Sequence, residues 1–283
     1  MTTTTTVSEQ DVALPDGRTL HIYDTGAGAA DRTVVWHHGT PNVGLPPKPL
    51  FVTSEELGIR WVSYDRPGYG GSTPNGGRDV ASAAHDVRAI LDALEIDTCT
   101  VMGHSGGGPH ALACAALLPG RVRGALSVSG LAPYDAEGLD YFAGMAPAGV
   151  GSLHAAAEGR PARAAYEESS SEEDIGFIAA DEQALSGDWS WFLEVVRPAL
   201  AQGPDAMIDD DVASAAPWGF DVRRIEVPVL VVHGRADRMV PADHGKWLAA
   251  AIPGAEARIL PGDGHISVMH AAPDALRWLV QQS

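Results

Sequence analysis

The sequence predicts an α/β fold with a mostly parallel, doubly wound sheet and a helical cap inserted after the sixth strand. Short apolar segments of strand type alternate with helix-spaced segments up to residue 132 and again after residue 217. Between these stretches, residues 133–217 carry no strong strand signal. We therefore divide the chain into a first core segment (1–132), a cap (133–217) and a second core segment (218–283).

The first core segment begins with a predicted hairpin, because residues 12–14 and 19–23 flank the turn sequence Pro15-Asp16-Gly17. Further strands are predicted at residues 33–37, 59–64, 98–102 and 124–129. A helix is predicted over residues 79–94, where apolar side chains recur at helical spacing, and a second helix-compatible run covers 109–118.

The second core segment continues the same alternation. It has predicted strands at residues 229–232 and 257–260 and predicted helices at 243–251 and 273–281. An insertion between the strand at 124–129 and the strand at 229–232 would lie over the carboxyl ends of the strands. Binding sites of open α/β sheets form at this edge.

Composition narrows the partners that this chain can have. The 283 residues include 19 basic and 37 acidic side chains, for a formal net charge of −18. This balance disfavours nucleic acid and anionic membrane surfaces, since both are bound through clustered Lys and Arg. We expect a small-molecule substrate, no nucleic-acid partner and no membrane partner, and we leave the oligomeric state open.

The N-terminal segment bears on location. Met1 is followed by five threonines, without the basic start and apolar stretch of a signal peptide. No apolar run of the sequence approaches the length that spans a bilayer. These features predict a cytoplasmic protein.

The predicted strand at residues 98–102 leads into a Gly-x-Ser-x-Gly sequence with Ser105 at its centre. Followed by a helix, this motif predicts a nucleophile elbow, a turn sharp enough to force its serine into a strained backbone conformation. Gly103 and Gly107 suit the turn because larger side chains there would collide. We predict that Ser105 is a catalytic nucleophile.

A serine nucleophile needs a base and an acid that orients the base. Asp237 follows the predicted strand at 229–232, and His265 follows the predicted strand at 257–260. The chain order Ser, Asp, His and the position of each residue after a strand predict that Asp237 is the acid and His265 the base. Asp135, which follows the strand at 124–129, is the alternative acid.

The oxyanion of an acyl-transfer reaction needs two hydrogen-bond donors. Gly106, the residue after the nucleophile, is expected to supply one through its N–H group. The other is expected from the loop that follows the strand at 33–37, where Thr40 precedes Pro41, which has no N–H to donate.

The serial motifs resemble those of the α/β-hydrolase superfamily, in its capped esterase and proline-iminopeptidase-like branch. The resemblance rests on His-Gly-Thr-Pro at 38–41, Asp-Arg-Pro-Gly-Tyr-Gly-Gly-Ser at 65–72, the elbow, His-Gly-Arg-Ala-Asp at 233–237 and Gly-His at 264–265. It implies Ser105, Asp237 and His265 as triad, with Thr40 and Gly106 as oxyanion donors. Haloalkane dehalogenases and epoxide hydrolases place Asp at the elbow, and proline iminopeptidases usually show His-Gly-Gly-Pro, so the chain departs from all three.

The substrate pocket is expected beneath the cap. We assign to it His104, Trp189, Trp191 and His38, of which His38 is expected to brace the oxyanion loop. At least one of the aromatic residues Trp189, Trp191, Phe192 and Trp218 should face Ser105. The core segments account for every catalytic group, so we expect the cap to set substrate preference alone. No metal-binding or cofactor motif is present, and we expect neither a metal nor a cofactor.

These features predict a serine hydrolase that cleaves an ester, thioester or lactone of a small to medium apolar compound through an acyl-enzyme on Ser105. The same triad could serve an aminopeptidase of the proline-iminopeptidase type or a hydrolase of carbon–carbon bonds. A hydrolase-fold receptor without catalysis is a further alternative. Such receptors usually lack the base or the nucleophile, whereas this chain has both.

Overall fold

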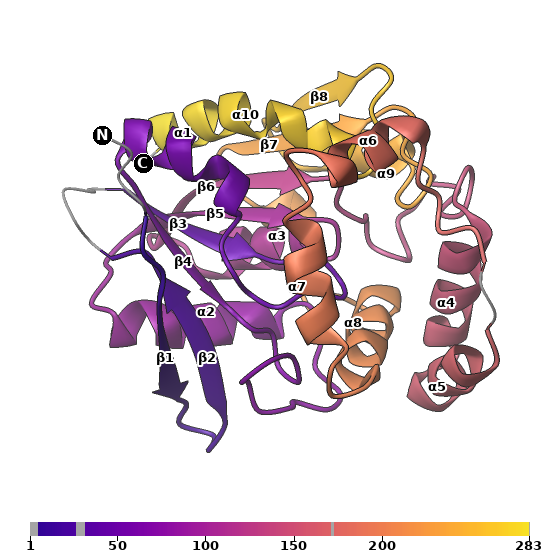
Figure 1. The fold of residues 1–283 in the computed structure, drawn as a ribbon, viewed down its shortest axis with the longest axis horizontal. Helices are drawn as coiled ribbons and strands as arrows, with labels where there is room; N and C mark the ends of the chain where they lie inside the picture. Colours follow the sequence, from indigo (N-terminus) through magenta and orange to yellow (C-terminus); the bar gives the residue numbers. More distant parts are fainter. Residues whose placement is uncertain (1–4, 27–31, 171–172, 283) are drawn as a thin grey trace.

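An eight-stranded sheet runs through the molecule in the order β1-β2-β4-β3-β5-β6-β7-β8 (Figure 1). The computed structural model describes residues 5–26, 32–170 and 173–282. The threonine-rich start of the chain therefore lies partly outside the described residues, at positions 1–4. All eight strands predicted from the sequence are present in the described residues.

The sheet is mostly parallel, as predicted. β1 (Ser8–Ala13) and β2 (Thr19–Asp24) form the hairpin, and β2 pairs antiparallel with β4 (Ile59–Tyr64). All remaining pairings are parallel. From β4 the sheet continues, each strand pairing with the next, through β3 (Arg32–His37), β5 (Cys99–His104), β6 (Val122–Val128), β7 (Val229–Gly234) and β8 (Glu256–Leu260).

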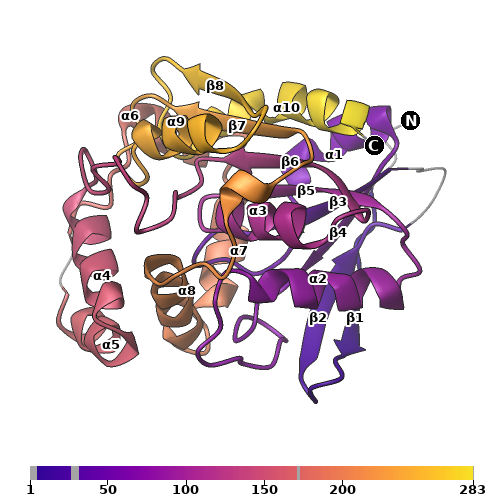
Figure 2. The ribbon, with the colours of Figure 1, turned by 180° about the vertical axis from the view of Figure 1, so that it is seen from behind.

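Helices cover both faces of the sheet (Figures 1 and 2). One face carries α2 (Ser82–Ala93), α3 (Gly107–Leu117) and α9 (Ala242–Ala251); the other carries α1 (Phe51–Leu57) and α10 (Ala272–Leu279). Successive strand residues point to opposite faces, so Val35 joins the core under α2 and α3 while Val34 joins the core under α10. Burial on both faces explains why these strands are continuous apolar runs.

One helix begins later than predicted, and another was not predicted at all. α2 begins at Ser82 rather than at residue 79 because the Asp79 carboxylate accepts the Ser82 N–H (2.8 Å), which fixes Asp79 ahead of the helix. α1 was not predicted. It spans only seven residues, and Val52 within it is 70% exposed, so the segment has no clear apolar face.

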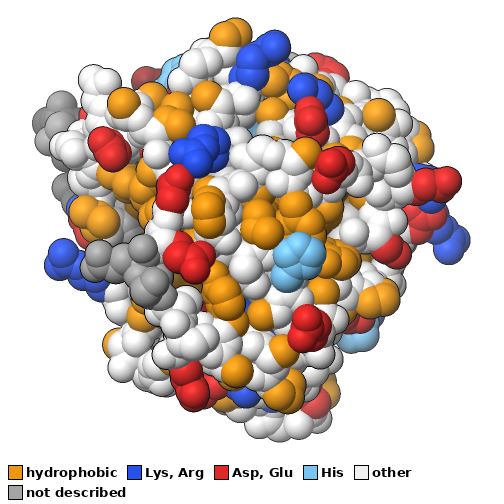
Figure 3. Space-filling model, turned by 90° about the vertical axis from the view of Figure 1, so that its right-hand side faces the viewer, with side chains coloured by type: hydrophobic (Ala, Val, Ile, Leu, Met, Phe, Trp, Pro, Cys, Tyr) orange, Lys and Arg blue, Asp and Glu red, His pale blue; other side chains and the backbone are white. Residues whose placement is uncertain are grey.

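Between β6 and β7 the described residues form five α-helices, a short 3-10 helix (Val222–Arg224) and no strand. The α-helices are α4 (Pro147–Ala157), α5 (Arg160–Ser169), α6 (Ala179–Ser186), α7 (Phe192–Ala199) and α8 (Asp205–Ala215). α4 and α5 lie side by side at one end of the molecule, with α8 packed against both (Figures 1 and 2). Acidic side chains lie scattered among apolar ones over this end (Figure 3). We call the five α-helices and their connections, residues 133–217, the insertion.

No helix within the described ranges combines the length and the apolar character that crossing a bilayer requires.

A buried ion-pair network ties α8 to the core. The Asp210 carboxylate accepts hydrogen bonds from Arg66 Nη2 (2.6 Å), Arg78 Nη2 (2.5 Å) and Tyr69 Oη (2.9 Å). Asp210 and Arg66 are both 1% exposed. Burial by itself would raise the pKa of Asp210, but the charges of Arg66 and Arg78 outweigh it and hold the pKa well below its usual range. Asp210 is therefore ionised, and its negative charge balances the two buried guanidinium groups of Arg66 and Arg78.

α3 packs unusually close to the end of β5. A side chain at Gly103 would overlap the Gly107 carbonyl, and one at Gly107 would overlap the His37 carbonyl. Backbone atoms form both obstacles, so neither can move aside as a flexible side chain would. The close approach depends on these two glycines.

Asp210→Asn should lower the free energy of unfolding by about 3–5 kcal/mol, because it leaves Arg66 and Arg78 buried without an anion. Urea denaturation measures this loss. Asp205→Asn is the matched control in the same helix: its carboxylate is exposed, so the change should stay below about 1 kcal/mol.

A comparison of the wild type with Asp210→Asn at different pH values tests the lowered pKa of Asp210. A carboxylate with a lowered folded-state pKa stabilises the protein fully above the unfolded pKa, about 4, and loses that effect as the pH falls. The stability difference between the wild type and Asp210→Asn should therefore shrink below about pH 4. A difference that stays constant down to pH 3 would show that Asp210 is not the stabilising anion.

Gly103→Ala should lower the free energy of unfolding by about 3 kcal/mol, since the new methyl group meets backbone on α3. Gly76→Ala is its control: the exposed Gly76 has no positive φ and no atom within 4 Å of the added carbon. That change should leave stability equal or slightly higher. Equal unfolding midpoints for both variants would contradict the packing argument.

Candidate active site

Ser105 lies at the turn between β5 and α3 in a left-handed backbone conformation, with a φ of 55°. This conformation is strained for a residue other than glycine. It is held in place because the Ser105 N–H donates to the Val128 carbonyl (2.9 Å) and the Ser105 carbonyl accepts from the Gly108 N–H (2.9 Å). Among the described residues the Ser105 hydroxyl has no hydrogen-bond partner, so it is free to meet a substrate.

Asp237 and His265 meet at the carboxyl edge of the sheet. His265 Nδ1 lies 2.8 Å from Asp237 Oδ2, and the other carboxylate oxygen accepts the N–H groups of Met239 (2.9 Å) and Val240 (2.8 Å). A carboxylate can only accept, so His265 carries a proton on Nδ1, and in its neutral form the lone pair is on Nε2. Burial alone would raise the pKa of Asp237, but His265 and His233 outweigh it and lower the pKa.

Ser105 and His265 line the same cavity, of about 320 Å³. The structure thus brings together the three residues that the sequence predicts as a triad, and the Asp237–His265 distance lies within hydrogen-bonding range. Asp135, the alternative acid, is exposed and lines a different hollow beside Trp247. It is not in contact with His265.

Thr40 and Gly106 lie beside Ser105 and beside each other. The position that a Cβ would take at Gly106 is 3.5 Å from the Thr40 nitrogen. Within the described part of the chain, neither N–H group has an acceptor. Both residues line a second cavity with Ser105. Two free N–H groups at this place could bind an oxyanion.

Buried hydrogen bonds to Arg66 and Asp210 hold the loop that carries Thr40. Arg66 Nη2 donates to the Gly39 carbonyl (3.0 Å), and the Thr40 hydroxyl donates to Asp210 Oδ2 (2.7 Å). His38 lies behind the loop and outside both cavities: its Nδ1–H donates to the Gly39 carbonyl (2.7 Å), and its Nε2 accepts the Arg66 N–H (3.0 Å). Burial, reinforced by Arg66, lowers the pKa of His38 well below 6.5, so His38 is neutral. Asp210 belongs to the insertion, and the sequence alone did not single it out.

The two cavities at Ser105 differ in character. The one of about 320 Å³ is apolar apart from Ser105, His104, His265 and the loop of Thr40; its other lining residues include Phe177, Leu185, Phe192, Leu193, Val196 and Ile266. The second, of about 540 Å³, has four charged side chains among its described lining residues: Arg163, Glu167, Glu173 and Asp211. Burial raises the pKa of Asp211 to about 6, so at pH 7 it is mostly ionised. The larger cavity is therefore net negative.

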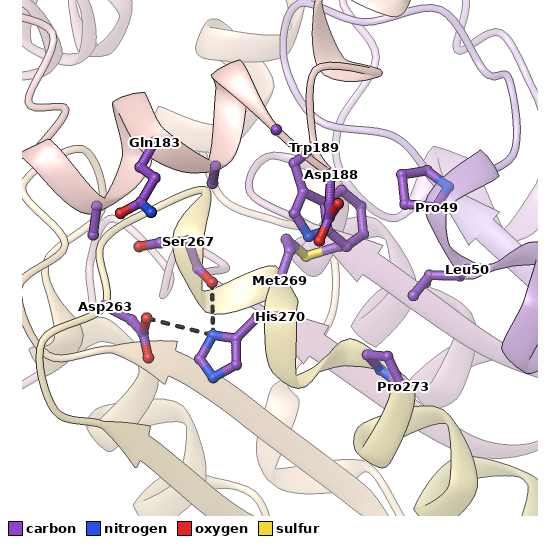
Figure 4. A pocket seen from close by; sticks show the side chains of 13 residues that line it. Pro49, Leu50, Gln183, Asp188, Trp189, Asp263, Ser267, Met269, His270 and Pro273 are labelled. Atoms are coloured by element: carbon purple, nitrogen blue, oxygen red, sulfur yellow. Dashed lines mark hydrogen bonds and ion pairs between the residues drawn. The ribbon is translucent and has the colours of Figure 1, made fainter.

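The residues that we assigned to the substrate pocket lie in different places. His104 lines the apolar cavity, and burial lowers its pKa to about 3. Trp189 instead lines a separate hollow of about 670 Å³ with Asp188 and Met269 (Figure 4). Trp191 packs edge-on against Trp36 in the core, 6.4 Å between ring centres. Phe192 is the aromatic residue of this group that shares a cavity with Ser105.

Neither tryptophan lines the two cavities at Ser105 as far as the described residues show. The sequence could not separate them from Phe192, because consecutive residues of a helix point in different directions and the orientation of α7 is set by its packing. In the described ranges, no three His, Cys, Asp or Glu side chains converge as metal ligands would.

Comparison with known proteins shows which family shares this sequence. The sequence model of the α/β hydrolase fold family matches residues 32–272. The chain is 30% identical to a 2-hydroxy-6-oxononadienedioate/2-hydroxy-6-oxononatrienedioate hydrolase of Cupriavidus pinatubonensis, over 90% of this chain and 88% of that protein. It is 29% identical to a non-heme chloroperoxidase of Kitasatospora aureofaciens, over 88% and 90% of the two chains.

The fold is also similar to solved structures. A bromoperoxidase of Bacillus anthracis superposes with a TM-score of 0.71 at 22% identity, covering 97% of this chain and all of the other. The family match spans most of the chain, and the sheet order and the strand–turn–helix at Ser105 agree with it. This chain belongs to the α/β hydrolase fold family.

Proposed function

We propose that this protein is a serine hydrolase that cleaves an ester-type bond of a small to medium apolar compound through an acyl-enzyme on Ser105. The observation that carries the proposal is the free Ser105 hydroxyl. It shares a cavity with His265, whose Nδ1 is hydrogen-bonded to Asp237 at 2.8 Å. Thr40 and Gly106, whose N–H groups are unpaired, line a second cavity together with Ser105.

In the first half of the reaction, His265 Nε2 takes the Ser105 proton as the hydroxyl attacks the carbonyl carbon. The negative charge that develops on the carbonyl oxygen is stabilised by the N–H groups of Thr40 and Gly106. Asp237 stabilises the imidazolium and keeps its Nδ1–H pointed at the carboxylate. Collapse of the intermediate breaks the ester bond, and the leaving alcohol departs with the proton from His265.

In the second half, His265 removes a proton from water as the water attacks the carbonyl carbon of the acyl-enzyme. Collapse of this second intermediate breaks the bond between the acyl group and Ser105 and releases the acid, and the proton on His265 returns to the Ser105 oxygen. His265 must reach the leaving oxygen, so the leaving group faces the cavity that His265 lines. This is the apolar cavity of about 320 Å³, whereas the acyl group points to the larger cavity on the side of Gly106. An apolar alcohol is the leaving group that this arrangement suits.

Carbon–carbon bond hydrolysis is the second candidate, because a relative with 30% identity is named as a hydrolase of a dioate. The lining of the larger cavity argues against a doubly anionic substrate, because its described residues include three carboxylates, those of Glu167, Glu173 and Asp211, and one guanidinium, that of Arg163. The same lining would suit an ammonium group, as an aminopeptidase requires. Nitrophenyl esters, aminoacyl anilides and the named dioate, assayed side by side, distinguish the three reactions.

Ser105→Ala should abolish labelling by a small fluorophosphonate and lower kcat by about 10⁴-fold or more, since it removes the nucleophile. Alanine has the same Cβ as serine, so the fold should persist, which circular dichroism checks. More than a tenth of wild-type activity in purified variant would exclude Ser105 as the nucleophile.

Val196→Trp should change preference for the leaving group, because Val196 lines the apolar cavity and a larger side chain fills it. Along a series of alkyl acetates, kcat/KM should fall for the butyl and hexyl esters while that for the methyl ester stays near wild type. The expected discrimination is about 1–3 kcal/mol.

Leu200→Trp is the control for Val196→Trp, since Leu200 directly follows α7 in the insertion, is 41% exposed and lines neither cavity. It should leave the order of preference unchanged. If Val196→Trp instead penalised long acyl chains and spared long alcohols, the two cavities would have the opposite roles.

A further inference from the structure

Both main-chain polar groups of His265, its N–H and its carbonyl, are hydrogen-bonded to side chains. Its carbonyl accepts a hydrogen bond from His104 Nε2 (3.0 Å), in the elbow. Its N–H donates to Asp181 Oδ2 (3.3 Å), in the first turn of α6. The side chain is held separately by Asp237. The backbone of the proposed base is thus fixed by one residue of the core and one of the insertion.

Asp181 binds the whole start of the segment that follows His265. Oδ1 accepts the N–H groups of Ile266 (2.9 Å) and Ser267 (2.8 Å) and the Ser267 hydroxyl (2.9 Å). Oδ2 also accepts the N–H of Ile178 (3.2 Å), which caps α6 itself. One carboxylate therefore joins helix α6 to three consecutive residues that begin with His265.

The carboxylate of Asp181 is fully buried and has no Lys or Arg partner among the described residues. A buried anion is tolerated only where donors replace its water, so these hydrogen bonds are what keep it in place. Asp181 differs in this respect from Asp210, which is paired with two arginines.

The chain around His265 is built to admit this carboxylate. A Cβ at Gly264 would overlap Asp181, so the residue before His265 can have no side chain there. The Gly264 N–H donates to the Ser267 hydroxyl (2.8 Å), and His270 Nδ1–H donates to the Ser267 carbonyl (2.9 Å; Figure 4). Residues 264–270 thus form one hydrogen-bonded unit that Asp181 anchors.

We propose that Asp181 is a positioning residue for catalysis: through the backbone of His265 it sets where the imidazole lies between Asp237 and Ser105. This inference rests on the proposed function, in which His265 is the base. It gives the insertion a part in the chemistry, whereas the sequence suggested substrate preference alone. A displacement of the His265 backbone would move Nε2 relative to the Ser105 hydroxyl, and proton transfer depends steeply on that geometry.

The test compares Asp181→Asn and Asp181→Ala with Glu182→Gln. Asparagine keeps the size of the side chain and one accepting oxygen, but its NH2 group faces N–H donors; alanine removes every bond. Glu182→Gln removes the same charge from the adjacent residue of α6, whose exposed side chain has no hydrogen bond or ion pair with the described residues. Each protein is assayed on a nitrophenyl ester and labelled with a small fluorophosphonate, following both the rate and the final extent.

The final extent of labelling counts folded sites, and the rate reports how well the base activates Ser105. Asp181→Asn should label to the wild-type extent but about tenfold more slowly, with kcat lowered by a similar factor and KM within about twofold. Asp181→Ala should be slower still, and Glu182→Gln should match the wild type. Ser267→Ala, which removes one donor to Asp181, should fall between the wild type and Asp181→Asn.

A lowered extent with an unchanged rate per folded site would show that Asp181 only stabilises the fold, and the inference would be overturned. The same conclusion would follow if Asp181→Asn retained the wild-type rate. Should both Asp181 variants fail to fold, an unchanged rate in Ser267→Ala overturns the inference and a lowered one supports it. Failure of the proposed function looks different: wild-type protein would then either not be labelled at Ser105, or be labelled without hydrolysing the nitrophenyl ester.

Discussion

The close approach of α3 to the end of β5 is the constraint on which the rest of the site depends. Glycines at 103 and 107 let the helix backbone touch the strand ends directly, and the chain between them turns within a few residues. Ser105 must then adopt a left-handed backbone conformation, held by hydrogen bonds to Val128 and Gly108. This places its hydroxyl at the carboxyl edge of the sheet, where the loops that follow β3, β7 and β8 begin.

Three buried aspartates organise those loops, and each is stabilised in a different way. Asp210 is paired with Arg66 and Arg78, Asp237 with His265 and two N–H groups, and Asp181 with N–H and hydroxyl donors alone. In a chain with a net charge of −18, few of the described carboxylates are buried. The few that are buried need fixed donors, so each of them ties one segment firmly to another.

The insertion therefore has two relations to the site. Its apolar side chains, among them Phe177, Leu193 and Val196, line the cavity next to His265. Its carboxylates at 181 and 210 bind the loops that carry His265 and Thr40. Relatives with similar cores are named as hydrolases and as haloperoxidases. One fold can carry several activities, because activity depends on the residues of the site and not on the fold.

Local pattern alone was enough to predict the eight strands, the parallel sheet and the elbow, because apolar runs, turn residues and glycine spacing act over a few neighbouring residues. The grouping of Ser105 with Asp237 and His265 followed from the rule that strand ends share one edge. The contact between Asp181 and His265 spans 84 residues, and that between Asp210 and Arg66 spans 144. No local pattern marks these carboxylates, nor Phe192 over its neighbour Trp191. Only the packing of the insertion onto the sheet brings each side chain to its partner.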